Sequence, residues 1–253
     1  MKDILLEAAE LIRINKPAAM CTVVQTEGSS PRKSGTRMIV LFDKTIIGTI
    51  GGGSVEHESM KRALEVIKTG KPILYNYNLK DDLQMECGGA MQVYIEALAN
   101  KPNLYIFGAG HVGKALSNLA VNFGFQITVI DERDNIFDDF ETNLLKVYNG
   151  DFTEFINTAD FNNKTFIVIM THEHKYDFDV LSKLCNKPHK YLGMIGSKTK
   201  VSQAKNQLIE KKILSEDKIN EIDMPIGIRI KCETPEEIAV SIIAKLIDVK
   251  NDI

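Results

Sequence analysis

Apolar positions along the first hundred residues follow both helical and strand-like spacings. Apolar residues three and four positions apart predict one amphipathic helix that ends before Pro17 and a second one that follows Gly53. Between and after these helices, short apolar or alternating runs predict strands. The helical faces carry Leu5, Ala8, Ala9 and Ile12, then Met60, Ala63, Leu64 and Ile67, and the strands are predicted at 18–24, 37–42, 45–50, 73–78 and 90–98.

The pattern changes after a polar, proline-containing break at 100–103. Short apolar strands now alternate with helical segments, which indicates parallel βαβ units with both sheet faces covered. A helix start is expected near Ser197, and Thr234, Pro235 and Glu237 form a capping box for the last helix. The predicted fold class is α/β, with a mixed α+β domain over 1–100 and a Rossmann-like domain over 101–253. The strands of this second half are predicted at 104–107, 126–130, 166–170 and 191–195.

Composition and charge narrow the classes of function. The 253 residues include 31 Lys and Arg against 34 Asp and Glu, a formal net charge of −3, and no long basic run is present. A nucleic-acid binder clusters Lys and Arg to neutralise phosphates, so this class is excluded. No apolar stretch reaches the roughly 18–20 residues that span a bilayer, and the first residues lack a signal-peptide pattern. We expect a cytoplasmic protein without a membrane or nucleic-acid partner.

A glycine loop in the second half carries the strongest single motif. Gly108, Gly110 and Gly113 match G-x-G-x-x-G, with His111 and Val112 inside it. A strand precedes the loop, a helix begins at it, and Asp131 ends the next strand, as a phosphate-binding Rossmann loop requires. The predicted ligand carries a phosphate, and Asp131 would accept a hydrogen bond from a ribose 2′-OH. NAD(P) is one such ligand, whereas a Rossmann domain put to another use would show the same residues.

The segment after the strand at 166–170 adds polar candidates at the carboxyl edge of the sheet. His172 and His174 flank Glu173 there, but their spacing lacks the geometry of a helical metal site, which favours polar residues on the rim of a binding site. They are also the residues that a dehydrogenase would need as proton donor or acceptor. An NAD-dependent oxidoreductase or an NAD-sensing regulatory module therefore stands as an alternative function.

The first half carries a second glycine motif and an accessible thiol. Gly51, Gly52, Gly53 and Ser54 lie between a strand and a helix, where bare backbone N–H groups attract an anion, and Arg32 adds positive charge nearby. A tight turn would use the same glycines. Cys87 stands beside two glycines at a strand entrance, which leaves its sulfur accessible. The other three cysteines are scattered and form no CxxC pair, so neither a disulfide framework nor a cysteine-rich zinc site is expected.

Together these motifs resemble the XdhC/CoxI family of molybdenum-hydroxylase accessory proteins. The resemblance covers nearly the whole chain, and the ordered set of motifs is far more specific than any one of them. The segments that carry it are 26–32, 48–56, 87–89, 107–113, 131–133, 171–172, 193–197, 225–227 and 233–239.

The resemblance implies a maturation chaperone that is not itself the hydroxylase. Such a protein binds molybdenum cofactor (molybdopterin) transiently, protects it, supports its sulfuration through a cysteine desulfurase, and inserts it into apo-xanthine dehydrogenase or a related enzyme. The resemblance is also consistent with a homodimer. One departure is that Ser54 stands where many family members carry cysteine, which leaves Cys87 as the only motif thiol.

Overall fold

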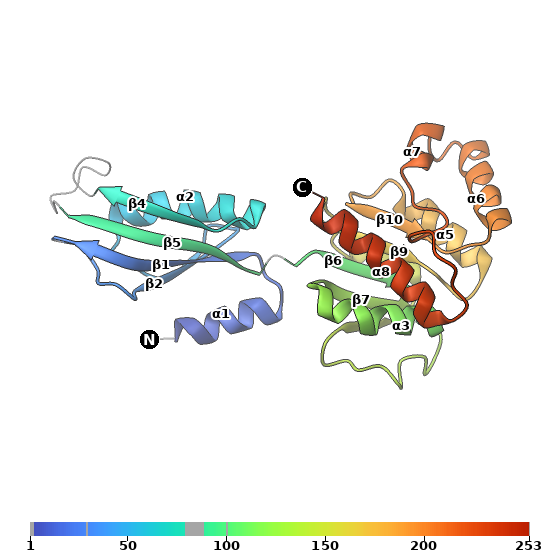
Figure 1. Ribbon diagram of the computed structural model, residues 1–253, viewed down its shortest axis with the longest axis horizontal. Coiled ribbons are helices and arrows are strands. Elements are labelled where there is room, and N and C mark those ends of the chain that lie inside the picture. Colours follow the sequence, from blue (N-terminus) through green and yellow to red (C-terminus); the bar gives the residue numbers. More distant parts are fainter. Residues whose placement is uncertain (1–2, 29, 79–88, 100, 253) are drawn as a thin grey trace. The chain divides into compact units, whose positions relative to one another are not determined.

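The chain folds into two compact units, Met1–Lys101 and Pro102–Ile253. A computed structural model describes residues 3–28, 30–78, 89–99 and 101–252 (Figure 1). Each unit has its own sheet and its own buried clusters, and each is described by itself below.

The first unit is an antiparallel five-stranded sheet with a helix on each face. The strand order is β3-β2-β1-β5-β4. Because side chains alternate across a strand, Ala19 and Cys21 pack in the cluster under α2, whereas Ala18 and Met20 pack in the cluster under α1. The elements are α1 (Ile4–Arg13), β1 (Ala18–Glu27), β2 (Arg37–Leu41), β3 (Ile46–Gly48), α2 (Gly53–Thr69), β4 (Ile73–Asn78) and β5 (Ala90–Ala99).

The second unit is a parallel five-stranded sheet in the order β10-β9-β6-β7-β8. Helices α3 and α8 cover one face and contact each other, while α4, α5, α6 and α7 contribute to the buried cluster on the other face (Figure 1). The strands are β6 (Asn103–Phe107), β7 (Gln126–Asp131), β8 (Lys146–Asn149), β9 (Phe166–Ile169) and β10 (Tyr191–Met194). The helices are α3 (His111–Ala120), the 3₁₀ turn η1 (Val121–Phe123), α4 (Phe152–Thr158), α5 (His174–Leu184), α6 (Lys198–Glu210), α7 (Glu216–Asn220) and α8 (Pro235–Asn251).

The fold class predicted from the sequence is confirmed. The capping box of α8 is formed, with Thr234 accepting from the N–H of Glu237 and the Glu237 carboxylate accepting from the N–H of Thr234. Strand β8 has no counterpart in the sequence prediction, because its four residues, only one of them aliphatic, form an edge strand without an alternating signal. Among the described helices, none combines the length and the apolar character needed to cross a membrane.

Candidate functional site

Three glycine-containing loops of the first unit lie close together. A Cβ atom on Gly51 would stand 2.7 Å from Pro31, and one on Gly28 would stand 3.3 Å from the Cα of Gly89. Both glycines also have positive φ, at +136° and +67°, where side chains are strained. The glycines are therefore required by the turns and by the close approach of neighbouring backbone. The structure thus brings together motifs that lie far apart in the sequence.

The first glycine loop, Gly51–Gly53, already holds an anion supplied by the protein. One carboxylate oxygen of Glu56, Oε1, accepts from the Thr49 hydroxyl at 2.5 Å, from the N–H of Gly52 at 2.9 Å and from that of Ile50 at 3.1 Å. Burial by itself would raise the pKa of Glu56, but these hydrogen bonds outweigh it and hold the pKa below its ordinary value. The N–H of Gly51 donates to the Thr49 hydroxyl at 3.2 Å, so three N–H groups around the loop are occupied internally. What is left for a ligand is the start of α2, where Gly52 provides no side-chain cap.

Other candidates of the first unit surround this loop. Arg32 and Ser54 are exposed, and the Arg32 side chain lies near Gly51, 3.7 Å from the position of its missing Cβ. Cys87, the candidate thiol, lies outside the described residues. The next described residues after it, Gly89 and Ala90, come beside Gly28 and Glu27, where β1 ends and β5 begins.

In the second unit, the candidate residues gather at the carboxyl ends of β6, β7 and β9. Strands β6 and β9 are neighbours, but the helices that follow them pack on opposite faces of the sheet: Leu116 of α3 lies in one buried cluster and Leu181 of α5 in the other. This arrangement is a topological switch point, and open α/β sheets bind ligands outside the strand ends at such a point.

The three glycines of the second loop, Gly108–Gly113, have different roles. A Cβ on Gly108, where φ is +118°, would stand 2.2 Å from the carbonyl oxygen of Met170, and one on Gly113 would stand 2.0 Å from that of Gly108. These two glycines are needed for the turn and for close packing of helix on strand. Gly110 caps α3 with φ near −67°, and no described atom beyond its chain neighbours lies within 4 Å of its Cβ position. Open space at a helix start fits the approach of a phosphate.

Two further loop residues were expected to contact the ligand. His111 is the exposed first residue of α3, whereas the Val112 side chain packs against the buried cluster on this face of the sheet. Val112 therefore has only its backbone N–H to offer, as one of the first-turn groups that lack an intrahelical partner.

Asp131 is buried at the end of β7, and its carboxylate is bound within the protein. Its Oδ2 accepts from the N–H of Ala109 at 2.8 Å, and the guanidinium of Arg133 bonds both carboxylate oxygens at 2.8 and 2.9 Å. Burial alone would raise the pKa of Asp131, but the bonds from Arg133 and Ala109 outweigh it and lower the pKa. The role predicted for Asp131, accepting from a ribose hydroxyl, stays a prediction and would require Arg133 to leave this position.

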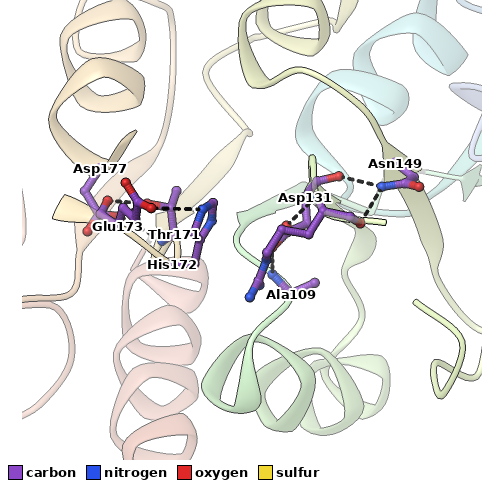
Figure 2. Close-up of polar contacts among 8 residues, drawn as sticks. Ala109, Asp131, Asn149, Thr171, His172, Glu173 and Asp177 are labelled. Carbon is purple, nitrogen blue, oxygen red and sulfur yellow. Dashed lines mark hydrogen bonds and ion pairs between the residues drawn. The ribbon is translucent and has the colours of Figure 1, made fainter. Parts of the chain in front are cut away.

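A second buried acid organises the loop after β9. Asp177 of α5 accepts from the N–H and the hydroxyl of Thr171, at 2.8 and 2.7 Å, and pairs with Lys200 of α6. Only 1% of the Asp177 side chain is exposed. Figure 2 shows Asp177 and Thr171, with His172 and Glu173, beside the group formed by Ala109, Asp131 and Asn149. Sequence reasoning missed Asp177 and Lys200, because an acid in the first turn of a helix and a lysine on the next helix look like solvated residues.

Among the residues that the structure describes, His172 in this loop has no close hydrogen-bond partner. Its Nε2 lies 3.9 Å from a carboxylate oxygen of Glu173, its ring centre lies 5.0 Å from that of Tyr176, and 22% of its side chain is exposed. The side chain of His174 is outside the described part of the structure. Across the residues that are described, no three His, Cys, Asp or Glu side chains converge as a metal-binding group.

Comparison with known proteins places this geometry in a family. The model of the XdhC Rossmann domain matches residues 104–246, more than half of the chain, and that of the XdhC and CoxI family matches residues 11–78. The chain belongs to the XdhC/CoxI family. The second glycine loop, Asp131 and the loop after β9 all lie within the XdhC Rossmann domain, and the Gly51–Gly53 loop lies within the other match.

Relatives extend the likeness over almost the whole chain of this XdhC/CoxI protein. It is 36% identical to Uncharacterized protein YqeB of Escherichia coli (strain K12) over 99% of its length, but it spans about half of that relative, 47%. It is 24% identical to a probable xanthine dehydrogenase subunit of Bacillus subtilis (strain 168), covering 99% of this chain and 96% of that protein. Identity to the Molybdenum cofactor insertion chaperone PaoD of Escherichia coli (strain K12) is 21%, over 98% of this chain and 88% of that one.

A solved structure shares the fold. The crystal structure of a xanthine dehydrogenase (BH1974) from Bacillus halodurans aligns with a TM-score of 0.52 at 24% identity, covering 98% of this chain and 96% of that one. At this identity the likeness concerns the arrangement of helices and strands alone.

Proposed function

We propose that this protein binds molybdenum cofactor as a cargo, supports its sulfuration by a cysteine desulfurase, and inserts it into apo-xanthine dehydrogenase or a related molybdenum hydroxylase. Membership of the XdhC/CoxI family supports the proposal. One relative is named as a molybdenum cofactor insertion chaperone, and another is named as part of a xanthine dehydrogenase. In this role the protein is a carrier, and the hydroxylase does the chemistry.

The observation that carries the proposal is the open space at Gly110. Molybdopterin ends in a phosphate, and a phosphate is stabilised by the unpartnered N–H groups and the positive end of a helix dipole. At Gly110 no described atom beyond its chain neighbours lies within 4 Å of the Cβ position, while Gly108 and Gly113 fix the turn of this loop. A site that relies on backbone groups at a helix start also suits a carrier, which must release its cargo.

The first unit carries a candidate site of its own, which we propose also serves the cofactor. The family motifs at Gly28, Gly51 and Gly89 lie close together, and Arg32 stands exposed beside them. As a proposal from the family motif alone, the thiol of Cys87 would bind the molybdenum or its dithiolene ligand. With Ser54 in place of the frequent cysteine, loss of Cys87 removes the only thiol in these motifs.

Equilibrium binding of freshly released molybdenum cofactor under anaerobic conditions tests the proposal. Wild type is expected to bind in the micromolar range or tighter, about 8 kcal/mol of binding free energy. The variant Gly110→Asp adds a negative charge where the phosphate would lie and should weaken binding at least about tenfold, or about 1.4 kcal/mol. Gly110→Ala is the matched control, since its methyl group meets no described atom and adds no charge. Cys87→Ser tests the thiol.

Three results would contradict the proposal. The first is the absence of cofactor binding to wild type. The second is equal affinity of the Gly110→Asp and Gly110→Ala variants, which would remove the phosphate from this loop. The third is that free cofactor activates apo-xanthine dehydrogenase as well as cofactor bound to this protein does. Oxidation of NADH by the protein with a carbonyl or purine substrate would instead favour the oxidoreductase alternative.

A further inference from the structure

The carboxylate of Asp131 has no acceptor position left for a ligand. A carboxylate oxygen accepts about two hydrogen bonds, and each oxygen of Asp131 has two donors. Oδ1 accepts from the N–H and the Nε of Arg133 at 3.1 and 2.9 Å, and Oδ2 accepts from Ala109 N–H and Arg133 Nη2, both at 2.8 Å. The side chain is fully buried. Arg133 supplies three of these four bonds.

The position of Arg133 is itself fixed by the neighbouring strand. The amide Nδ2 of Asn149, the last residue of β8, donates to the backbone carbonyls of Asp131 and Arg133 at 3.1 and 3.0 Å (Figure 2). The segment between these two carbonyls is therefore clamped at the end of the sheet. Because the buried charge of Asp131 is compensated by this guanidinium, moving Arg133 away would leave an unpaired buried carboxylate.

A nucleotide ribose would need acceptor positions on the Asp131 carboxylate that Arg133 already occupies. In dinucleotide-binding Rossmann domains, the acid at the end of the second strand accepts hydrogen bonds from a ribose hydroxyl. Here a hydroxyl would have to displace a bidentate, charge-assisted pair, which is among the stronger hydrogen bonds in proteins. We propose that Arg133 is a specificity-determining residue that excludes a ribose from Asp131, so that the second glycine loop accepts a phosphate monoester such as molybdopterin and rejects NAD(H).

This inference rests on the proposed function in one respect, that the loop receives the phosphate of a cargo. Exclusion of NAD⁺ by Arg133 is a separate property, and it can be measured without molybdenum cofactor. Isothermal titration of the full chain with NAD⁺ is the probe. Wild type is expected to show no saturable binding up to about 1 mM NAD⁺, a concentration that would reveal a Kd of about 1 mM or tighter.

Replacement of Arg133 should create the missing affinity. In Arg133→Ala the acceptor positions of Asp131 are freed, and NAD⁺ should bind with a Kd of about 0.1 mM or tighter, at least about tenfold below the limit set by wild type. The double variant Arg133→Ala with Asp131→Asn should lose this gain, because an amide replaces the charged acceptor. Arg229→Ala, which removes an exposed arginine elsewhere in the same unit, is the matched control and should behave as wild type. A gain of binding is a readout that simple destabilisation does not produce.

The outcomes that overturn the proposal are distinct. Saturable NAD⁺ binding to wild type that Arg133→Ala weakens would make Arg133 part of a dinucleotide site. Folded Arg133→Ala without any gain would show that Arg133 does not control ligand choice. If Arg133→Ala does not fold, Arg133→Gln and Asn149→Ala are used instead, because each weakens the contact between Arg133 and Asp131 with a smaller change. Loss of folding in all three would assign Arg133 to the fold instead of to ligand choice. None of these results depends on whether wild type binds molybdenum cofactor.

Discussion

At the scale of single residues, the protein uses its own carboxylates where an anionic ligand was expected. Glu56 accepts from two backbone N–H groups around the first glycine loop, and Asp131 accepts from the N–H of Ala109 in the second. Backbone N–H groups of both loops therefore stabilise the fold itself, and only the groups that are left can bind a ligand. Open space is left at Gly110, where a substitution tests ligand binding without a clash inside the protein.

The charge of Glu56 should make stability depend on pH. Its pKa in the folded protein lies below the ordinary value of 4.5, so the stabilisation is present above that value and is lost as pH falls through the lowered pKa. Thermal unfolding of wild type and Glu56→Gln between about pH 6 and about pH 3 measures it. At about pH 6 we expect wild type to unfold at a higher temperature than Glu56→Gln. At about pH 3 we expect the difference between the two unfolding temperatures to be smaller.

The control for this experiment lies on the same helix. Glu65→Gln removes an exposed carboxylate of α2 and should leave the pH dependence unchanged. A difference between wild type and Glu56→Gln that stays constant across the range would mean that the charge of Glu56 is not what stabilises the loop.

At the scale of elements, helix α5 connects the loop after β9 to the rest of its unit. Its buried Asp177 holds both polar groups of Thr171 and pairs with Lys200 of α6, so two helices and a strand end depend on one side chain. The same helix carries Asp179, whose pair with Lys183 is largely exposed. Helix α5 therefore carries one buried ion pair and one exposed ion pair, and substitutions of Asp177 and Asp179 compare their contributions to stability.

Removal of these two charges should have unequal effects. Asp177→Asn leaves Lys200 without its buried partner and should cost about 3 kcal/mol or more, whereas Asp179→Asn should cost less than about 1 kcal/mol. Hydrogen exchange of the buried β9 amides in the full chain measures the opening free energy of this unit. Equal losses in the two variants would show that the Asp177–Lys200 pair contributes no more than a surface pair.

At the scale of the whole molecule, each unit has what an independent domain needs. The two buried clusters of the first unit draw only on residues up to Leu98, and those of the second begin at Leu104. Each sheet also has its helices on both faces. The polar segment around Lys101 and Pro102 therefore joins two separate cores.

Fragments cut at this segment should fold without each other. Residues 1–101 and 102–253, expressed separately, are expected to give cooperative thermal transitions with the secondary structure of their respective units, measured by circular dichroism. We expect the sum of the two spectra to match that of the full chain. A fragment that is soluble only as a molten or aggregated species would show that its core is completed by the other unit.

Local spacing along the chain was enough to predict the fold class, the main strands and the glycine loops. Period-two and period-3.6 patterns specify which face of an element is buried, and the strand, glycine loop and helix around Gly108–Gly113 are contiguous. The polar break at 100–103 indicates a domain boundary in the same way, and this boundary stays a prediction. The capping box at Thr234 was predictable for the same reason, since all its atoms lie within four residues.

The folded chain, in contrast, decides which polar groups are still available to a ligand. The sequence pattern predicts Asp131 as a ribose acceptor, but its partner Ala109 lies 22 residues away and the folded unit brings Arg133 onto the same carboxylate. The pairing of Asp177 with Lys200 spans 23 residues and two helices. Arg133 is only two residues from Asp131, but its conformation is fixed by Asn149 at the end of a neighbouring strand. A carboxylate oxygen accepts about two hydrogen bonds, and the fold decides which donors occupy those positions.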